Sequence, residues 1–334
     1  MNKSIKDKIV LITGGAGTIG SGILKEVLKH EPKTVRVIDN DETRLFELEQ
    51  EFRKHKNIRY LLGDIRDKER TRTAMNGVGV VFHAAALKHV SACEYNSFEA
   101  IKTNILGLQN VIDAAIEAGV ERLIFTSSDK AVNPTNVMGT TKLLGEKLVT
   151  AANYYKGSHD IKLASVRFGN VIGSRGSVVP LFKKQVENGG PLTVTDPEMT
   201  RFMMSAQEAV ALIIKSLEIM KGGEVFILKM PVFKLSVLVE AMKELSERDV
   251  ETEIIDAKPG EKKFEELMTL EESKRALETD DMFIVLPEMK ELLQRNDYNY
   301  PGAKKAEIRE YSSKTAAVLP KSEIKLFLKN INVI

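Results

Sequence analysis

The chain has 334 residues, of which 43% are hydrophobic and 29% charged, the balance of a folded globular protein and not of a disordered one. Its 49 basic and 47 acidic side chains leave a formal charge of only +2, so no global field favours nucleic acid or a membrane surface as a partner. The single cysteine, Cys93, excludes an internal disulfide, and without paired Cys or His spacings the sequence predicts no metal site.

Short apolar runs alternate with helix-like stretches through the first half of the chain. The run Ile9–Thr13 ends at a glycine turn, after which apolar residues recur at helical spacing at positions 23, 24, 27 and 28. Continuous apolar strands separated by amphipathic helices are typical of a parallel sheet covered on both faces. We therefore expect a Rossmann-type, doubly wound α/β fold. Further strands are expected at Thr34–Asp39, Ile58–Leu62, Val80–His83, Arg122–Ser127 and Lys162–Phe168, and helices at Glu42–Lys54, Ser97–Ala118 and Asn136–Tyr155.

The second half of the chain is more broken. Beyond Asn170, glycines and prolines between positions 173 and 197 divide it into short elements. At this length a large first domain with a smaller second one is expected. We expect residues 1–170 to form the first domain, to which some later segments return, and residues 171–334 to form mainly a smaller, interleaved second domain. Its predicted helices lie near Ser205–Lys221 and Lys234–Glu247, and its predicted strands near Glu224–Leu228 and Glu251–Ile255.

Three glycines follow the first predicted strand. Gly14, Gly17 and Gly20 stand between it and a helix, the context of a dinucleotide-binding turn, where glycine lets backbone approach a pyrophosphate. Asp39 ends the second strand, where a carboxylate accepts hydrogen bonds from ribose hydroxyls and repels a 2′-phosphate. We expect NAD, with NADP left open by Arg44 nearby; the alternatives are a turn without ligand and Asp39 as a helix cap. The other expected cofactor contacts are Thr18, Ile19, Asp64, Ile65, Ala84, Ala85 and Ala86.

A longer motif narrows the family. The segment from Ser127 to Lys142 contains an Asp-Lys pair at 129–130 and Asn-Pro-Thr-Asn at 133–136. It resembles the UDP-N-acetylglucosamine 4,6-dehydratases, a branch of the extended short-chain dehydrogenase/reductase superfamily. The resemblance extends to about residue 320, with supporting stretches at 86–90, 102–107, 167–180, 199–202 and 258–262.

The resemblance implies roles within this segment. Asp129 is the expected acid for a departing C6 hydroxyl and Lys130 the expected base for the C5 proton, so we expect burial to keep the acid protonated and the amine able to be neutral. The alternative is a surface ion pair. Ser128 is expected to hydrogen-bond the C4 oxygen, and Lys142 to hold the nicotinamide ribose. Met138 replaces the superfamily's tyrosine, and a thioether cannot exchange a proton.

Family chemistry implies three steps. Hydride leaves C4 for NAD, the C5 proton and the C6 hydroxyl are eliminated, and the hydride returns to C6. Retention at C5 is favoured here, with inversion as the alternative. Two further readings stay open: a 4-epimerase or ketoreductase, which Met138 argues against, and a catalytically silent UDP-sugar-binding protein, which Met138 supports and an intact Asp129-Lys130 pair opposes.

The substrate expected from the resemblance is UDP-N-acetylglucosamine, held mainly by the second domain of a homo-oligomer. Arg201 suits a diphosphate and Glu261 a ribose diol. No run of about 18 apolar residues and no leader-like N-terminus is present, so the sequence predicts a cytoplasmic address and no membrane or nucleic-acid partner. Further expected contacts are Lys88, His89, Asn170, Ser177 and Val178 to the substrate, and Asn104 near the cofactor.

Overall fold

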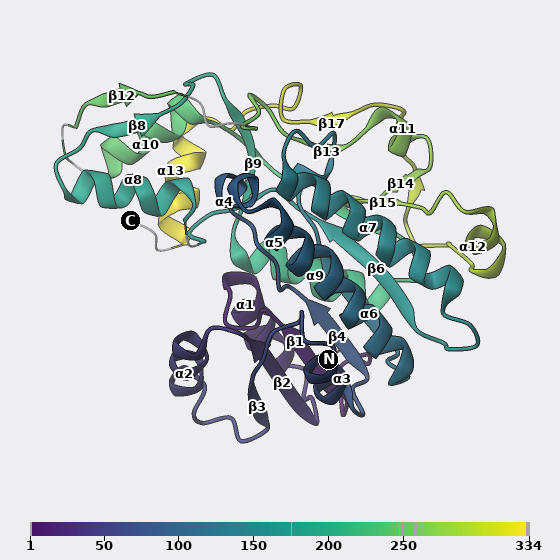
Figure 1. Ribbon diagram of the computed structural model, residues 1–334. Helices are drawn as coiled ribbons and strands as arrows, with labels where there is room; N and C mark the ends of the chain where they lie inside the picture. The colour runs from purple at the N-terminus through teal and green to yellow at the C-terminus, as the bar shows by residue number, and fades with distance from the viewer. Residues whose placement is uncertain (1, 175, 247, 249, 257–259, 332–334) are drawn as a thin grey trace.

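The computed structural model describes residues 2–174, 176–246, 248, 250–256 and 260–331. Ten strands form one large sheet through the molecule (Figure 1). They are β1 (Ile9–Thr13), β2 (Thr34–Asp39), β3 (Ile58–Leu62), β4 (Val80–His83), β5 (Arg122–Thr126), β6 (Lys162–Arg167), β10 (Val225–Leu228), β14 (Ala276–Glu278), β15 (Met282–Val285) and β16 (Lys304–Lys305).

The order of strands across this sheet is β16-β14-β15-β10-β6-β5-β4-β1-β2-β3. The strands from β3 to β10 in that order are parallel, and β15, β14 and β16 extend the sheet with antiparallel pairing. The predicted doubly wound parallel sheet is confirmed. The order reverses at β1, which has β2 on one side and β4 on the other, and open α/β sheets bind their ligands at such a switch point.

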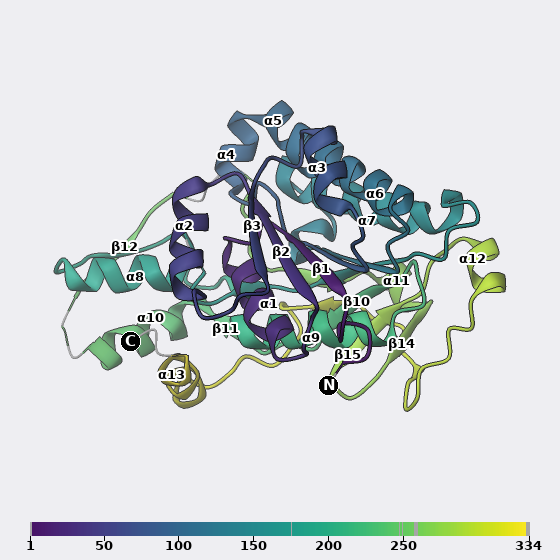
Figure 2. The ribbon, with the colours of Figure 1, turned by 90° about the horizontal axis from the view of Figure 1, so that it is seen from below.

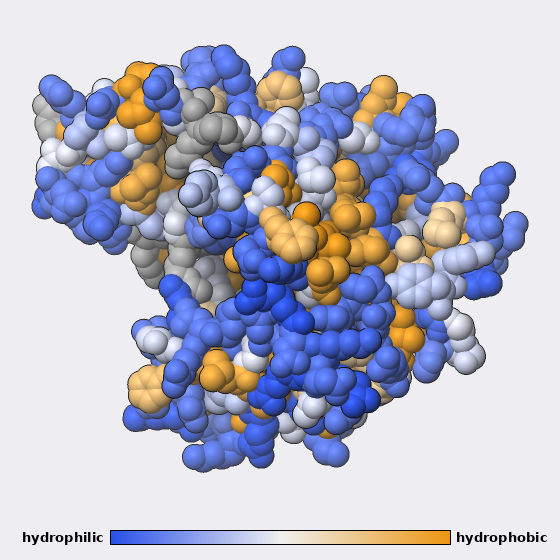
Figure 3. Space-filling view, in the orientation of Figure 1, coloured by the Kyte–Doolittle hydropathy of each residue, from blue (hydrophilic) through white to orange (hydrophobic). Residues whose placement is uncertain are grey.

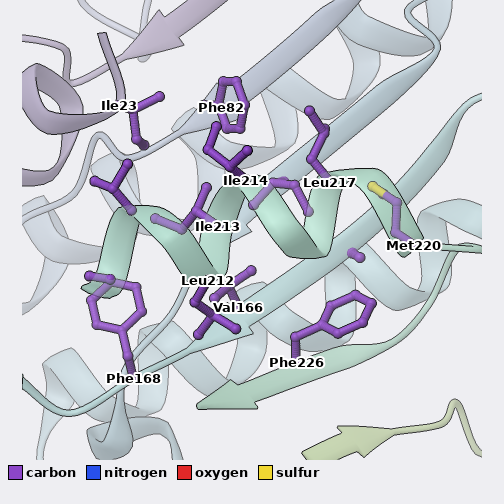
Figure 4. Packing of buried hydrophobic residues seen from close by; sticks show 14 of the residues in the cluster. Ile23, Phe82, Val166, Phe168, Leu212, Ile213, Ile214, Leu217, Met220 and Phe226 are labelled. Carbon is purple, nitrogen blue, oxygen red and sulfur yellow. The ribbon is translucent and has the colours of Figure 1, made fainter. Parts of the chain in front are cut away.

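Helices cover both faces of the sheet, as Figure 2 shows. Side chains of β1 alternate between the two: Val10 and Ile12 pack into one core and Leu11 into the other. On the first face, Phe82 and Val166 of the sheet lie against Ile213 and Leu217 (Figure 4). The helices of that face are α1 (Thr18–Leu28), α2 (Glu42–Glu51) and α9 (Ala206–Ile219), and those of the other are α3 (Lys68–Met75), α6 (Leu108–Glu117) and α7 (Val137–Tyr155).

The helix expected over 97–118 is interrupted, which corrects the prediction. It consists of α5 (Ser97–Ile101), a π-helical turn (Lys102–Gly107) and α6, and a short helix α4 (Val90–Tyr95) precedes it. Within the π turn, the buried Asn104 amide donates to the Leu87 carbonyl at 3.0 Å and accepts from the Leu87 N–H at 2.8 Å. Such widened turns often mark functional sites, and here the turn fastens the loop that follows β4.

The second half adds short elements and a core of its own around Phe182 and Phe233. The predicted helix near 234–247 is α10 (Leu235–Ser246); Glu247 lies outside the described residues. The small sheets pair β7 (Asn170–Val171), β9 (Thr200–Met204) and β11 (Val232–Lys234), β8 (Leu192–Val194) with β12 (Thr252–Ile254), and β13 (Glu266–Met268) with β17 (Tyr311–Ser312). The other helices are α8 (Val178–Glu187), α11 (Leu270–Ser273), α12 (Lys290–Arg295) and α13 (Lys321–Asn330).

Candidate active site

A cleft of about 820 Å³ opens at the carboxyl ends of the parallel strands, a size that suits a bound small molecule. Its walls come from the segments that follow β1 to β6 and from residues 168–177 of the second half. In Figure 3 the surface is hollowed between the lobe that carries α8 and the lobe that carries α2. Within the part of the chain that the structure describes, no cluster of metal-ligating side chains occurs and no helix is long and apolar enough to cross a membrane.

The glycine turn after β1 lines the cleft. Gly14 has φ of +65°, and a Cβ built on it would lie 2.6 Å from the Cα of Ala85 in the loop after β4. A Cβ on Gly20 would lie 2.6 Å from the Cα of Gly15, so α1 can pack on the turn only without side chains there. The N-cap of α1 is Gly17, which leaves the helix N-terminus uncapped by a side chain beside the cleft. Backbone N–H groups at such an end suit a phosphate.

Asp39 lies at the end of β2 and lines the same cleft. Its Oδ2 accepts a hydrogen bond from the Ala16 N–H at 3.0 Å, and its Oδ1 accepts one from the Asp41 N–H at 3.1 Å. The cap of α2 is Asp41, which accepts from the Arg44 N–H. The Arg44 side chain also forms an ion pair with Asp41, with Arg44 Nε 2.9 Å from Asp41 Oδ2. Asp39 is therefore not the helix cap, and its carboxylate faces the cleft.

The segments after β3 and β4 supply the neighbouring wall of the cleft. Ile65 and the alanines 84–86 line this wall, as the sequence predicted. Asp64 also lines the cleft and pairs with Arg66 at 2.6 Å. Burial acts to raise the pKa of Asp64, but the hydrogen bonds and charge of Arg66 outweigh it and hold that pKa below its usual range. Asn104 was expected at the cofactor; the structure places it behind this wall, bonded to Leu87.

The Ser-Asp-Lys segment after β5 is held by the continuation of β6. The Ser127 N–H donates to the Val166 carbonyl at 2.7 Å, and the Asp129 N–H donates to the Phe168 carbonyl at 3.0 Å. Asp129–Ala131 then forms a 3-10 turn. A Cβ on Gly139 of α7 would collide with the Lys130 carbonyl, so the helix packs closely on this turn. Gly139 was not singled out from the sequence, although it lies within the quoted motif.

A buried charged cluster gathers at this turn. The Ser128 hydroxyl donates to Asp129 Oδ1 at 2.6 Å, and Lys130 Nζ donates to the same oxygen at 3.0 Å and to Asn170 Oδ1 at 3.2 Å. Glu265 Oε1 lies 3.7 Å from Lys130 Nζ. Ser128, Lys130 and Asn170 line the cleft, whereas Asp129 is fully buried behind them. Asp129 thus meets the cleft through the side chains of its two neighbours.

The cluster corrects the expectation that burial makes Lys130 neutral. Burial does act to lower the pKa of the Lys130 ammonium, but the negative charges of Asp129 and Glu265 outweigh it and leave that pKa above its usual value. The resting amine is therefore charged. Glu265 was missed from the sequence because it comes close to Lys130 only through the fold.

Met138 and Lys142 lie one turn apart on α7, so they share a face of that helix and both line the cleft. Met138 is buried against Cys93 and Ala100. Lys142 Nζ donates to the Thr126 carbonyl at 2.9 Å. Burial lowers the pKa of Lys142 to about 8.

The motif at 129–136 is hydrogen-bonded to the segment 260–266, which is distant in the sequence. The Asn136 side chain donates to the Gly260 carbonyl at 3.2 Å, Lys262 Nζ donates to the Val132 carbonyl at 2.7 Å, and the Asn133 side chain donates to Glu266 at 3.0 Å. Two stretches that the resemblance quoted separately therefore form one structure. Lys258 and Pro259 of the second stretch, and Arg175 of another, lie outside the described residues.

Arg201 and Glu261 were both expected to bind a nucleotide. They lie together beside the 260–266 segment, with Arg201 Nη2 3.8 Å from Glu261 Oε1. The Arg201 guanidinium donates to the carbonyls of Lys262 at 2.6 Å and Thr200 at 2.9 Å. Neither Arg201 nor Glu261 is among the described residues that line the cleft. In this structure Arg201 fixes the 261–263 backbone.

The remaining predicted substrate residues come from the loop after β4 and from the segment before α8. Lys88, His89 and Ser177 line it, and burial lowers the pKa of Lys88. A Cβ on Gly176 would lie 2.7 Å from the His89 ring, so the two loops meet closely there. Val178 begins α8 directly behind Ser177.

Known proteins share this chain's sequence over most of its length. The family model described as polysaccharide biosynthesis protein matches residues 10–287. The UDP-N-acetylglucosamine 4,6-dehydratase (inverting) of Campylobacter jejuni subsp. jejuni serotype O:23/36 is 42% identical over 294 residues, covering 87% of this chain and 86% of that protein. A UDP-glucose 4-epimerase of Rickettsia rickettsii is 37% identical over 333 residues, covering 98% and 97%.

A solved structure, the X-ray structure of Pen from Bacillus thuringiensis, is 49% identical, with a TM-score of 0.94 and 99% of each chain covered. The sequence match and the shared fold agree on one assignment. The chain belongs to the polysaccharide biosynthesis protein family.

Proposed function

We propose that this protein is a UDP-N-acetylglucosamine 4,6-dehydratase that uses NAD and forms a UDP-4-keto-6-deoxy-N-acetylhexosamine. The observation that carries the proposal is the Ser128-Asp129-Lys130 cluster in the wall of a cleft that a dinucleotide-type glycine turn also lines. The 42% identity to a protein named for this activity supports it. Hydride transfer at C4 needs one group to exchange the hydroxyl proton, whereas elimination across C5 and C6 needs both an acid and a base.

The cleft fits NAD at each point where the described residues can be tested. Gly14 leaves no room for a side chain against Ala85, and the uncapped N-terminus of α1 suits the pyrophosphate. Asp39 presents a carboxylate for the ribose hydroxyls, and Lys142 an ammonium for the second ribose. When bound, NAD would take a hydride from C4 of the sugar and later return it to C6.

The chain's own groups would carry the protons. Lys130 Nζ lines the cleft and is the group that takes the C5 proton. Asp129 relays a proton toward the C6 hydroxyl, and its contact with the cleft runs through the Ser128 hydroxyl, 2.6 Å away.

We propose retention at C5, and the residues of the cluster support it. With Met138 in the place of a tyrosine, Lys130 is the proton-exchanging side chain that the cluster presents to the cleft. A single group that removes the C5 proton and then returns it acts on one face of the sugar, so the configuration is kept. The relative named as inverting makes inversion the alternative, and the configuration of the product decides between them.

A UDP-sugar 4-epimerase is the second candidate, because relatives with that name are 37% identical over nearly the whole chain. Incubation of the purified protein with UDP-N-acetylglucosamine, followed by mass spectrometry, separates the readings. A dehydratase product lacks one water, an epimerase product has unchanged mass and a new C4 configuration, and a binding protein returns the substrate. We expect the loss of water.

Self-association is part of the proposal. Apolar side chains gather on the face that α5 and α7 present in Figure 3. Phe98 is 64% exposed, and Ile101 and Leu144 are also exposed. Contiguous apolar surface of this kind favours contact with another protein surface, and a second copy of this chain is the partner that we propose. Sedimentation of the purified protein tests it.

A further inference from the structure

A second buried carboxylate faces Lys130 from the far half of the chain. Glu265 is 3% exposed, and its Oε1 lies 3.7 Å from Lys130 Nζ and 4.0 Å from Arg201 Nε. Its other oxygen, Oε2, is buried and has no hydrogen-bond partner among the described residues. Such a group costs free energy. Packing alone therefore does not account for Glu265.

The backbone holds Glu265 firmly in this place. Its N–H donates to the Ser313 hydroxyl at 2.9 Å, and its carbonyl accepts from the Ser313 N–H at 2.8 Å. The Ser313 hydroxyl is in turn 2.9 Å from that of Thr200, beside Arg201. The next residue begins β13, which pairs with β17. The carboxylate therefore points at Lys130 because strands far from Lys130 in the sequence hold it there.

The charges in the cluster raise a problem for the proposed base. Lys130 is charged at rest, as shown above, and an ammonium cannot take the C5 proton. Burial raises the pKa of the Glu265 carboxyl and so brings it closer to that of an amine, while the Lys130 charge acts the other way. A carboxylate with a raised pKa, within 3.7 Å of the ammonium, is a suitable acceptor for its proton.

Building on the proposed dehydration, we propose that Glu265 takes a proton from Lys130 and so frees the amine to act on the substrate. An Nζ–H bond of Lys130 breaks and an Oε1–H bond of Glu265 forms. The neutral amine takes the C5 proton, the C5–H electron pair forms a C5–C6 double bond, and the hydroxyl leaves C6 as water with a proton supplied through Asp129. The proton of the C4 hydroxyl, released in the oxidation, balances the proton lost in that water.

The groups around Glu265 define what its removal changes. Lys130 and Asp129 face it from the 3-10 turn, Arg201 faces it from β9, and Lys262 lies on its own segment. Replacing Glu265 with glutamine removes a negative charge beside Lys130, which lowers the pKa of Lys130. If Glu265 only held Lys130 in place, its removal would make Lys130 easier to deprotonate and so a better base. Water loss at neutral pH would then stay the same or rise.

A proton acceptor gives the opposite result. In Glu265→Gln we expect water loss at neutral pH to fall by about two orders of magnitude, the value of a positioned proton-transfer group. The loss should diminish as the pH rises, because Lys130 must then give its proton to solvent. The double variant Glu265→Gln/Lys130→Ala should lose little more than Lys130→Ala alone, since the two groups serve one step.

Glu266→Gln is the matched control, because it neutralises the adjacent carboxylate, which binds Asn133 and not Lys130. Any effect of this change should be the same at every pH. The thermal midpoint and the affinity for UDP, measured for each variant, report on folding. Near-normal turnover of Glu265→Gln at neutral pH, or a loss that does not vary with pH, would overturn the inference.

A spectroscopic measurement separates this inference from the proposed function. Infrared difference spectra of the wild type, taken from mildly acidic to alkaline pH, should show a protonated carboxyl band that Glu265→Gln lacks and Glu266→Gln keeps. If the wild type fails to dehydrate UDP-N-acetylglucosamine, the proposed function is wrong, and the infrared titration still decides whether Glu265 exchanges a proton. Absence of that band at every pH counts against the inference whatever the reaction.

Discussion

The Asp39 carboxylate at the end of β2 accepts a hydrogen bond from the backbone N–H of Ala16 in the glycine turn, at 3.0 Å. This contact ties the end of β2 to the glycine turn that follows the neighbouring strand β1, and it fixes the carboxylate at the cleft. The charge that would face the hydroxyls of an adenosine ribose is therefore held in position before any ligand arrives.

Replacing Asp39 with serine should relax the preference for NAD over NADP. The carboxylate repels a 2′-phosphate, and the serine hydroxyl can still accept a hydrogen bond. Cofactor released from the purified wild type should be NAD, and the affinity for NADP, measured by calorimetry, should rise in the variant with little change in the thermal midpoint. Finding mainly NADP in the wild type would show that this reading of Asp39 is wrong.

Met138 should not need to be a tyrosine for activity. It is buried against Cys93 and Ala100, so a phenol ring at this place would overfill the wall of the cleft. We expect Met138→Tyr to turn over UDP-N-acetylglucosamine no faster than the wild type. A silent wild type that gains activity in Met138→Tyr would instead support the UDP-sugar-binding protein.

The sequence predicted the parallel sheet well because apolar residues recur through each of its first six strands, although single polar residues such as Arg36 interrupt some of them. β5 and β6 differ from the expected ranges only by ending at Thr126 and Arg167, one residue earlier. The π turn was missed because helical periodicity continues through it, and only the contact of Asn104 with Leu87 shows why the turn widens. Strands as short as β7 carry no periodicity of their own.

Only part of the site could be predicted, because a sequence shows local motifs and not the contacts that the fold creates. Residues on the family's motifs, such as Lys130 and Asn170, could be named from the sequence, and they lie together at the cleft. The charge state of Lys130 could not be inferred, because it depends on Glu265, which the fold brings from the other half of the chain. Burial alone gave the wrong direction for that amine.

The buried Arg167 should be the most sensitive ionic residue of the fold. It is 1% exposed and donates to Glu146 at 3.0 Å, to Glu272 at 2.9 Å and to the Leu267 carbonyl at 2.8 Å. Arg167→Met leaves the buried Glu146 carboxylate and the partly buried Glu272 carboxylate without their partner, so the free energy of unfolding should fall by about 3–5 kcal/mol. Denaturant unfolding measures this.

Neutralising the carboxylates in the same protein, as Arg167→Met/Glu146→Gln/Glu272→Gln, should recover part of that loss because no unpaired charge remains. A single Arg167→Met variant as stable as the wild type would contradict the argument.

Lys142 should make stability depend on pH. Burial lowers its pKa from 10.5 to about 8 in the folded protein, so between these values the unfolded chain binds more protons and the free energy of unfolding rises with pH. The contribution is complete above the unfolded pKa and is lost as the pH falls through about 8; the shift corresponds to about 3 kcal/mol. Unfolding of Lys142→Met, without added cofactor, should lack this rise.

Lys147→Met is the control for that measurement, since Lys147 lies on the same helix with its side chain 59% exposed. It should keep the wild-type dependence on pH. An equal slope in the wild type and in Lys142→Met between pH 8 and 10 would show that the Lys142 proton is not displaced.

Asp129 and Lys130 provide the most direct test of the mechanism. Elimination needs an acid and a base, whereas the oxidation at C4 needs neither of these two groups directly. Asp129→Asn and Lys130→Ala should therefore bind UDP and cofactor as the wild type does and lose dehydration by about two to four orders of magnitude. The double variant should lose little more than the worse single one, because both groups serve one step.

Solvent deuterium separates the roles of the two residues. Lys130→Ala should stop the exchange of the C5 hydrogen, because the amine is the group that removes it, whereas Asp129→Asn should slow water loss and leave some exchange at C5. Lys130 donates to Asp129 at 3.0 Å, so Asp129→Asn also removes a charge that holds the amine protonated, and its exchange should persist to lower pH than in the wild type. Exchange at C5 that continues in Lys130→Ala excludes Lys130 as the base, and near-normal turnover in both single variants would leave the elimination without its proposed acid and base.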